Sequence, residues 1–325
     1  MSSSVDIAVV IPTYRRPDLL RRCLEALLQQ SLDAALYEVL VVDDGRSDDT
    51  RAVVEELAAR PGAPQLRYLQ PQGTRGPAAA RNRGWRATLA PLVAFTDDDT
   101  VPDRRWLEEG RHALGRKLVA ASGRVVVPVL GPPTDHARMT QGLETAEFVT
   151  ANAFVRRSAL ERVGGFDERF KRAWREDSDL QFMLLEHCGE VGRAPRAVVV
   201  HPVREARWGI SLWQQENVSF DALLFKKHPQ LFKTRIRSQP PWRYILIVLS
   251  TLAALGLALA GQGLAALLAL LLALGGILGF AFKRLRGASL APSHVAEMLV
   301  TSFAIPYLAV YWRFVGAWRF RVFFI

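Results

Sequence analysis

Cysteine is scarce in this 325-residue chain: Cys23 and Cys188 are the only two, and they form neither a metal-type nor a paired spacing. A disulfide framework is therefore not expected, and a reducing compartment fits. The sequence has no GxGxxG or GxxxxGK[ST] loop, the usual signals of dinucleotide-binding and P-loop enzymes. The N-terminus, MSSSVDIAVVIP, lacks a basic segment and a long apolar run. We therefore expect no signal peptide, and predict that the first domain stays in the cytoplasm.

Negative charge is in the minority, since 42 Lys and Arg stand against 32 Asp and Glu and give a net charge of +10. This excess favours a polyanionic neighbour, such as nucleic acid, anionic lipid or a phosphorylated substrate. The distribution of the charge separates these possibilities. Just before a long apolar block, the chain carries Lys226, Lys227, Lys233, Arg235, Arg237 and Arg243. This stretch favours membrane lipids as partners over nucleic acid.

The first half of the chain contains alternating patterns of strands and helices. Short apolar runs predict strands, and apolar residues at helical spacing predict the helices between them. Strands are expected at 7–11, 39–42, 66–69 and 92–95, and helices at 19–30, 51–59 and 78–89. The alternation predicts an α/β fold with a mostly parallel, doubly wound sheet flanked by helices. Ligands of such sheets bind beyond the carboxyl ends of the strands.

Three consecutive carboxylates, Asp97, Asp98 and Asp99, directly follow the fourth expected strand. Aspartate is common in turns, so the cluster alone also fits an ordinary strand end. Like charges at this spacing repel, however, and a hard divalent cation bound through oxygen would relieve the repulsion. Polar groups also follow two other strands, at Pro12–Arg15 and Asp43–Gly45. Because the fold brings these strand ends together, they predict a ligand site.

Six segments resemble, in the family's order, the signatures of family 2 glycosyltransferases of the GT-A fold. They read VVIPTYRRPDLLRRCLEALLQQ, EVLVVDDGRSDDT, GPAAARNRGW, VAFTDDDTVPDRRWLE, VGGFDERF and REDSDL, and the resemblance covers roughly residues 5 to 205. It implies a metal-dependent, inverting hexosyltransferase with a GT-A fold. The donor would be a nucleotide-diphosphate sugar, with a UDP-sugar as the first choice.

The resemblance also assigns donor-side roles. The nucleotide would contact Pro12, Thr13, Tyr14 and Asp44. The family's DxD motif falls on Asp97 and Asp99, with Asp98 as the middle residue, and would bind the donor diphosphate through Mg²⁺ or Mn²⁺. Arg81 would add a cationic contact near the phosphates, although an arginine on a solvent-facing helix is an equally ordinary interpretation. His201 would contact the metal or the diphosphate, or would simply end a strand.

On the acceptor side, the resemblance makes Asp177 the general base that takes the proton of the acceptor hydroxyl. Glu176 precedes it, and both lie in or just before the first turn of a helix expected at 177–186. Acidic residues are also favoured at helix N-termini by the helix dipole, which is the ordinary alternative. The segment TANAFVRRSALERVGGFDERF resembles the family's acceptor side and contributes Asn152.

Two long blocks of the second half contain no charge, Tyr244–Ala260 and Leu264–Phe282, and only Gly261–Gly263 separates them. At ~1.5 Å per residue each block crosses most or all of a ~30 Å hydrocarbon core. They predict a C-terminal transmembrane helical hairpin, with two buried core helices as the alternative. Ile210–His228 mixes Trp, Phe, Leu and Lys, as an interfacial helix would.

A third apolar segment, Val295–Val315, is interrupted by Glu297, Pro306 and Arg313. If it crossed the membrane, Arg319 and Arg321 would lie outside, against the positive-inside rule. We therefore predict two crossings, with the basic loop Lys283–Arg286 and the C-terminus in the cytoplasm and the third segment in the interface.

Five segments are expected from these patterns. Residues 1–100 would form the nucleotide-sugar-binding half of the catalytic domain, and 101–208 the acceptor-side half with the base. Residues 209–242 would be an interfacial basic linker, 243–282 the transmembrane hairpin, and 283–325 a basic loop followed by an interfacial or third membrane helix.

The expected protein is a glycosyltransferase anchored in a bacterial-type inner membrane, with a cytoplasmic catalytic domain and a membrane-proximal acceptor that is lipid-linked or a glycan. Arg204–Trp208, REARW, resembles the (Q/R)xxRW motif of processive synthases. A processive polysaccharide synthase is therefore one alternative. A catalytically silent membrane scaffold that keeps the fold is the other, and the intact acidic motifs argue against it.

Overall fold

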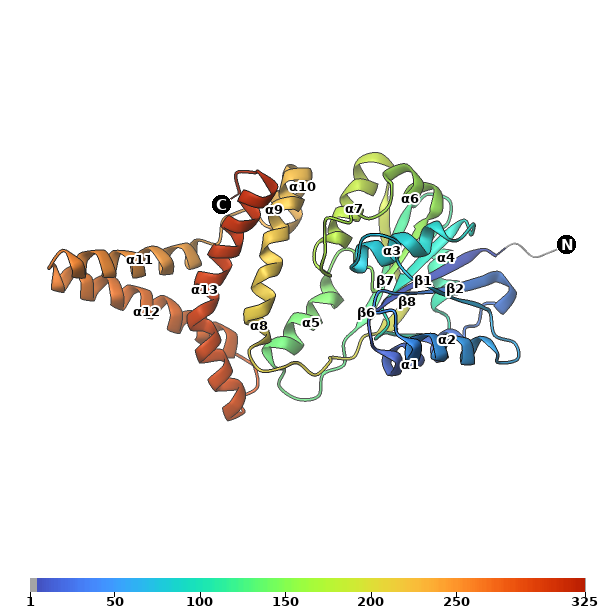
Figure 1. Ribbon diagram of the computed structural model, residues 1–325, viewed down its shortest axis with the longest axis horizontal. Helices are drawn as coiled ribbons and strands as arrows, with labels where there is room; N and C mark the ends of the chain where they lie inside the picture. The colour runs from blue at the N-terminus through green and yellow to red at the C-terminus, as the bar shows by residue number, and fades with distance from the viewer. Residues whose placement is uncertain (1–4, 325) are drawn as a thin grey trace. The chain divides into compact units, whose positions relative to one another are not determined.

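The computed structural model describes residues 5–324 (Figure 1). Contacts within the chain divide it into two compact units. The first unit comprises the residues up to 128 together with 141–203, and the second comprises 129–140 together with 204–325. Among the described residues, the strands all belong to the first unit and the long apolar helices to the second.

Four parallel strands form the amino-terminal half of the sheet, as the apolar runs predict. They are β1 (Ile7–Thr13), β2 (Tyr37–Asp43), β3 (Gln65–Leu69) and β4 (Leu92–Thr96), which lie in the order β3-β2-β1-β4. The helices between them are α1 (Pro17–Leu27), α2 (Asp48–Ala58) and α3 (Pro77–Arg86). The strand order reverses at β1, because β2 and β4 lie on its two sides. Such a switch point opens a crevice at the carboxyl ends of the strands, where ligands bind.

The rest of the sheet is mixed. β7 (Asn152–Arg156) pairs antiparallel with β4, and β6 (Ala120–Val126), β8 (Val191–Val200) and β5 (Val101–Pro102) complete eight strands. Helices α3, α6 (Arg157–Val163) and α7 (Glu176–His187) share one apolar core on one face, and α1 and α2 pack together on the other (Figure 1). α4 (Trp106–Leu114) packs on β6 and β8. The predicted α/β fold with a mostly parallel sheet is confirmed.

Helix α3 lies very close to the sheet because of Gly84. A Cβ atom at this position would lie 2.3 Å from Cγ1 of Val10 on β1, so no larger residue fits unless the Val10 side chain or the helix moves. Pro77 begins the helix, where its fixed φ suits the first turn. This close approach places Arg81, one turn before Gly84, against the end of β4.

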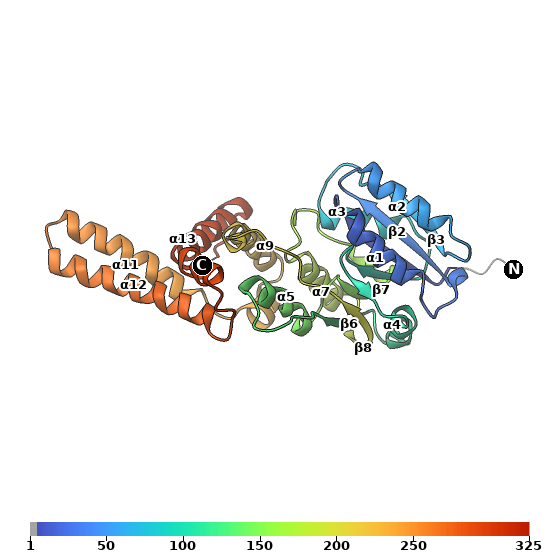
Figure 2. The same cartoon turned by 90° about the horizontal axis from the view of Figure 1, so that it is seen from below.

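The second unit is helical. It contains α8 (Ile210–Trp213), a 3₁₀ turn (Gln214–Asn217), α9 (Val218–Lys227), α10 (Pro229–Leu231), a π turn (Phe232–Ile236), α11 (Trp242–Leu259), α12 (Gly263–Leu285) and α13 (Pro292–Phe320). Three of the described helices, α11, α12 and α13, are long and apolar enough to span a membrane. α11 and α12 form an antiparallel hairpin, whereas α13 runs crosswise to it and packs along α9 (Figures 1 and 2).

The second unit also includes a segment from the middle of the chain, Val129–Thr140, where α5 (Asp135–Thr145) begins. Arg284, which is 8% exposed near the end of α12, forms an ion pair with Asp135, with 2.7 Å between its Nη2 and Asp135 Oδ2. The Asp135 backbone N–H donates to Nε2 of His294 at the start of α13. Arg138 donates to the carbonyl oxygens of Arg284 and Arg286, which would otherwise be unsatisfied at the helix end. These bonds hold the segment to the end of α12 and the start of α13.

The structure corrects one expectation: the stretch Lys283–Arg286, which we expected to be a basic loop, is mostly helical. α12 continues through Leu285, so Lys283 and Arg284 belong to its last turn. Arg284 also donates to the hydroxyls of Thr301 and Ser302, at 2.7 and 3.0 Å. The charge of Arg284 therefore does not face solvent. Asp135 neutralises it inside the protein, and the hydroxyls satisfy its remaining donors, as a buried guanidinium requires.

Candidate active site

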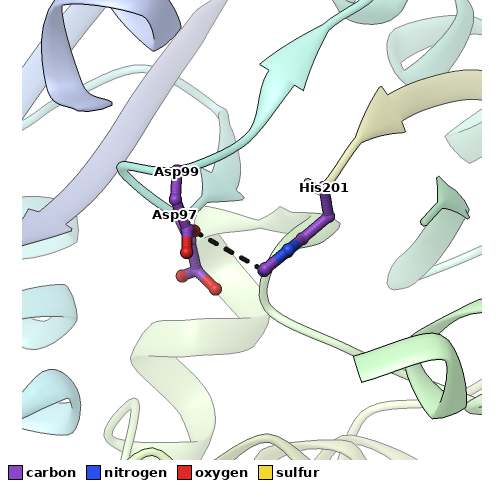
Figure 3. A group of neighbouring side chains, drawn as sticks. All are labelled: Asp97, Asp99 and His201. Carbon is purple, nitrogen blue, oxygen red and sulfur yellow. Dashed lines mark ion pairs between the residues drawn. The ribbon is translucent and has the colours of Figure 1, made fainter. Parts of the chain in front are cut away.

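Two of the three consecutive carboxylates meet a histidine at the carboxyl edge of the sheet. Asp97 and Asp99 follow the end of β4, and His201 follows the end of β8 (Figure 3). One ligand atom from each side chain lies within 4.8 Å of the other two. Asp99 Oδ1 is 3.5 Å from His201 Nε2, and both residues are buried, whereas Asp97 is partly exposed. These three residues, from two strand ends far apart in the sequence, form the acidic cluster.

The donor atoms of the acidic cluster suit a divalent cation. Carboxylate oxygens are the preferred protein ligands of Mg²⁺ and Mn²⁺, and an imidazole nitrogen adds a neutral third ligand. His201 Nδ1 lies 3.3 Å from the carbonyl oxygen of Pro202. A proton on Nδ1 would donate to that oxygen and leave the lone pair of Nε2 facing Asp99, which is the tautomer that a metal ligand needs. The residues present therefore fit a cation held by two carboxylates and one histidine.

Asp98 makes other contacts. It is 3% exposed, and it accepts hydrogen bonds from the Thr13 hydroxyl at 2.7 Å and from Arg16 Nη1 at 3.0 Å. Burial raises the pKa of the Asp98 carboxyl to about 6, while Arg16 and Thr13 act in the opposite direction. Asp98 thus ties the end of β1 to the end of β4. A direct contact between Asp98 and the donor stays a prediction.

Arg81 lies between two carboxylates, with 2% of its surface exposed. Its Nη2 is 2.8 Å from Asp97 Oδ1, and its Nη1 is 3.0 Å from Glu176 Oε1. The alternative of an arginine on a solvent-facing helix is therefore wrong. Arg81 joins α3 to the end of β4 and to the start of α7.

The first turn of α7 supplies a second acidic pair. Glu176 is 3% exposed, and burial together with the charge of Asp177 raises its pKa to about 7. Burial also raises the pKa of Asp177, although part of its surface remains exposed, and the Ser178 backbone N–H donates to its Oδ1 at 2.7 Å. A carboxylate with a raised pKa and an exposed edge is suited to accept a proton at neutral pH.

The predicted nucleotide contacts lie at the switch point of the sheet. Asp44 Oδ2 accepts a 2.9 Å hydrogen bond from the Gly76 backbone N–H. Its Oδ1 is buried and has no hydrogen-bond partner within residues 5–324, which leaves an acceptor for a ligand. In the segment at the end of β1, Tyr14 is about half-exposed and Pro12 is partly exposed, and the Thr13 hydroxyl donates to Asp98.

Asn152, predicted on the acceptor side, is fully buried. Its amide donates to the carbonyl oxygens of Arg124 and Ala197, each at 2.9 Å, and accepts from Trp106 Nε1 at 2.9 Å. These bonds commit both amide hydrogens to the protein itself. A contact between Asn152 and the acceptor stays a prediction.

Arg16 is a site residue that the sequence interpretation missed. Besides Asp98, its Nη1 lies 3.9 Å from Asp99 Oδ2. The only local signal was its position beside Arg15 in the turn after β1. That signal is weak, because arginine is frequent in this chain.

Comparisons with known proteins agree with this geometry. Residues 8–164 match the sequence model of the family Glycosyl transferase family 2. The chain is 29% identical over 170 residues to glycosyltransferase AglE of Haloferax volcanii, which covers 49% of this chain and 55% of that protein. It is 30% identical over 276 residues to validoxylamine A glucosyltransferase of Streptomyces hygroscopicus, which covers 69% of this chain and 61% of that protein. The chain thus spans less than two thirds of these curated relatives.

Among solved structures, the chain resembles the mannosyltransferase PcManGT of Pyrobaculum calidifontis, determined with GDP-Man and Mn²⁺. The TM-score is 0.58 at 20% identity, over 98% of this chain and 88% of that one. At this identity the likeness concerns the fold. Residues 8–164 match the family model, and the carboxyl edge of the sheet that they begin gathers Asp97, Asp99 and His201, so this part of the chain belongs to glycosyl transferase family 2.

Proposed function

We propose that this protein is an inverting glycosyltransferase that moves a hexose from a nucleotide-diphosphate sugar to a membrane-proximal acceptor. The observation that carries the proposal is the acidic cluster of Asp97, Asp99 and His201, connected through Arg81 to the helix turn that bears Asp177. One end of this arrangement suits a cation and a diphosphate, and the other end offers a base. In direct displacement at an anomeric carbon, the base takes the proton of the attacking hydroxyl, and a cation would stabilise the departing diphosphate.

On the donor side, the nucleotide would lie at the switch point, with the free Oδ1 of Asp44 as one acceptor for it. Asp97, Asp99 and His201 would hold Mg²⁺ or Mn²⁺, and GDP-Man with Mn²⁺ in the structural relative supports this assignment. A bound cation would supply charge neutralisation of the departing nucleoside diphosphate. A UDP-sugar is our first choice of donor, and a GDP-sugar is the second.

On the acceptor side, Asp177 would take the proton of the attacking hydroxyl from the face opposite the leaving group, so the sugar would be inverted. Glu176 and Arg81 would fix the turn that carries it. The membrane helices favour an acceptor at the bilayer, either lipid-linked or a growing glycan, with membrane lipids as partners.

The second unit supports two crossings of a bacterial-type inner membrane with the catalytic unit in the cytoplasm. The segment Val129–Thr140, whose chain enters from β6 and leaves toward β7, is bonded to the end of α12 and the start of α13. The opposite end of α13 accepts a 2.8 Å hydrogen bond at the Phe320 carbonyl from Lys226, before α11. Both ends of α13 are thus tied to segments of the second unit that lie outside the hairpin, Val129–Thr140 at one end and Lys226 of α9 at the other.

An interfacial position also explains the surface of α13. One face packs on α9, and the other exposes large apolar side chains at helical spacing: Leu299, Phe303, Tyr311, Phe314 and Trp318. A helix with one protein-covered face and one such apolar face can lie in the headgroup region, with its aromatic rings at interfacial depth.

Cysteine labelling tests this topology. The C-terminal Ile325 lies outside the described residues, and Ile325→Cys in a background without Cys23 and Cys188 is expected to resist a membrane-impermeant thiol reagent in intact cells. The same variant should react after permeabilisation. The matched control is Gln262→Cys in the exposed turn between α11 and α12, which should react in intact cells. Labelling of Ile325→Cys in intact cells would mean that α13 crosses the membrane.

A donor screen tests the proposed activity. The purified protein with Mn²⁺ and a membrane lipid extract is expected to release nucleoside diphosphate from one UDP- or GDP-sugar, and to form a glycosylated product of inverted configuration. Product size separates addition of a single sugar from processive synthesis, which would give a ladder. Absence of release from every nucleotide sugar would favour the silent scaffold.

A further inference from the structure

Both terminal nitrogens of Arg81 are bound to protein carboxylates, which is not expected of an arginine whose main role is to bind the donor phosphates. Arg81 belongs to α3, and its two terminal nitrogens bind Asp97 after β4 and Glu176 at the start of α7. Its guanidinium also lies 5.8 Å from the ring centre of Phe166, in the chain that leads to α7. With 2% exposure, it is enclosed by these groups.

The planar guanidinium group fixes both the distance and the direction of its partners. It presents its donors in a rigid fork, so two carboxylates bound to Nη1 and Nη2 take defined positions relative to each other. Asp97 belongs to the acidic cluster, and Glu176 immediately precedes the proposed base. Without the positive charge between them, the partly exposed carboxylate of Asp97 and the buried carboxylate of Glu176 would repel each other, and Glu176 would lose its only cationic partner within the described residues.

The neighbouring residue holds the same stretch of chain. The Asn82 side chain donates to the carbonyl oxygen of Phe166 at 2.8 Å and accepts from the Phe166 backbone N–H at 2.9 Å. The close packing of α3 on β1 at Gly84 keeps this helix fixed. One turn of α3 therefore binds two neighbouring segments. Asn82 binds the backbone of Phe166, in the chain before α7, and Arg81 binds Glu176 in the first turn of α7.

We infer that Arg81 is a positioning residue that sets the separation between Asp97 and the base-bearing turn of α7, and does not serve mainly to bind the donor phosphates. This inference rests on the proposed function. A donor held at the acidic cluster would then present its anomeric carbon at a fixed distance from Asp177. Errors of about 1 Å in such geometry cost on the order of 10²-fold in rate.

Arg81→Lys tests the inference, because lysine keeps the charge but has a single ammonium point in place of a fork. We expect kcat to fall by on the order of 10- to 100-fold, while nucleoside diphosphate binding in Mn²⁺, measured by calorimetry, stays within about 3-fold of the parent. Arg83→Lys on the same helix is the matched control, since Arg83 is partly exposed and lies outside the acidic cluster. It should leave kcat and binding unchanged.

A double-mutant cycle with Glu176→Gln gives a second readout. If Arg81 acts through Glu176, the losses in kcat from Arg81→Lys and Glu176→Gln should be strongly non-additive. Thermal unfolding of each variant shows that it is folded. Equal loss of nucleotide binding and kcat in Arg81→Lys would make Arg81 a donor contact and overturn the inference, as would parental kcat. A parent protein without turnover would instead count against the proposed function.

Discussion

Asp177→Asn is expected to bind the nucleotide sugar with near-parental affinity while its turnover falls by on the order of 10²-fold or more. The amide keeps the shape of the carboxyl group and can still accept from the Ser178 N–H, but it cannot take the proton of an acceptor hydroxyl. Donor binding measured by calorimetry, and nucleoside diphosphate release measured with acceptor present, separate the two effects.

The pH dependence of turnover in the parent protein also tests whether Asp177 is the base. Only the ionised carboxylate is a base, so turnover falls as the pH drops through the pKa of Asp177. Because burial raises this pKa, the acidic limb is expected above the ordinary aspartate value of about 3.9. Glu186→Gln, an exposed change on the same helix, is the control and should leave turnover unchanged. Collapse of donor binding together with turnover in Asp177→Asn would place Asp177 in the donor site.

Asp99→Asn is expected to abolish most activity, and chelation should do the same to the parent. A neutral amide is a much weaker ligand of a hard cation than a carboxylate, and Asp99 Oδ1 lies 3.5 Å from His201 Nε2 within the acidic cluster. Nucleoside diphosphate release should stop in excess chelator and return when Mg²⁺ or Mn²⁺ is added. Direct titration with Mn²⁺ should show weaker binding to the variant.

The matched control for this charge change is Asp49→Asn, because Asp49 is exposed in the first turn of α2 and outside the acidic cluster. It should retain parental activity and parental Mn²⁺ binding. Full turnover of the parent protein in excess chelator would contradict the assignment of a cation to Asp97, Asp99 and His201.

Local sequence patterns determined the fold class and the edge of the sheet where the site lies. Apolar runs alternating with helical spacing predicted β1 to β4 and α1 to α3. For β1, β2 and β4 the signal is strong, because burial of a parallel strand on both faces leaves a continuous apolar signature. Carboxylates directly after such strands must lie at the carboxyl edge, so Asp97 and Asp99 could be placed there before any coordinates. The long uncharged blocks of α11 and α12 were equally evident.

Only the tertiary structure decided which polar groups meet. Arg81 and Glu176 are 95 positions apart, and Asp135 and Arg284 are 149 apart, so no local pattern joins them. Asp97, Asp98 and Asp99 look alike in the sequence, yet Asp98 binds Thr13 and Arg16 while the other two join His201. Backbone direction and long-range packing set these partners, and a buried charge persists only where the fold supplies one.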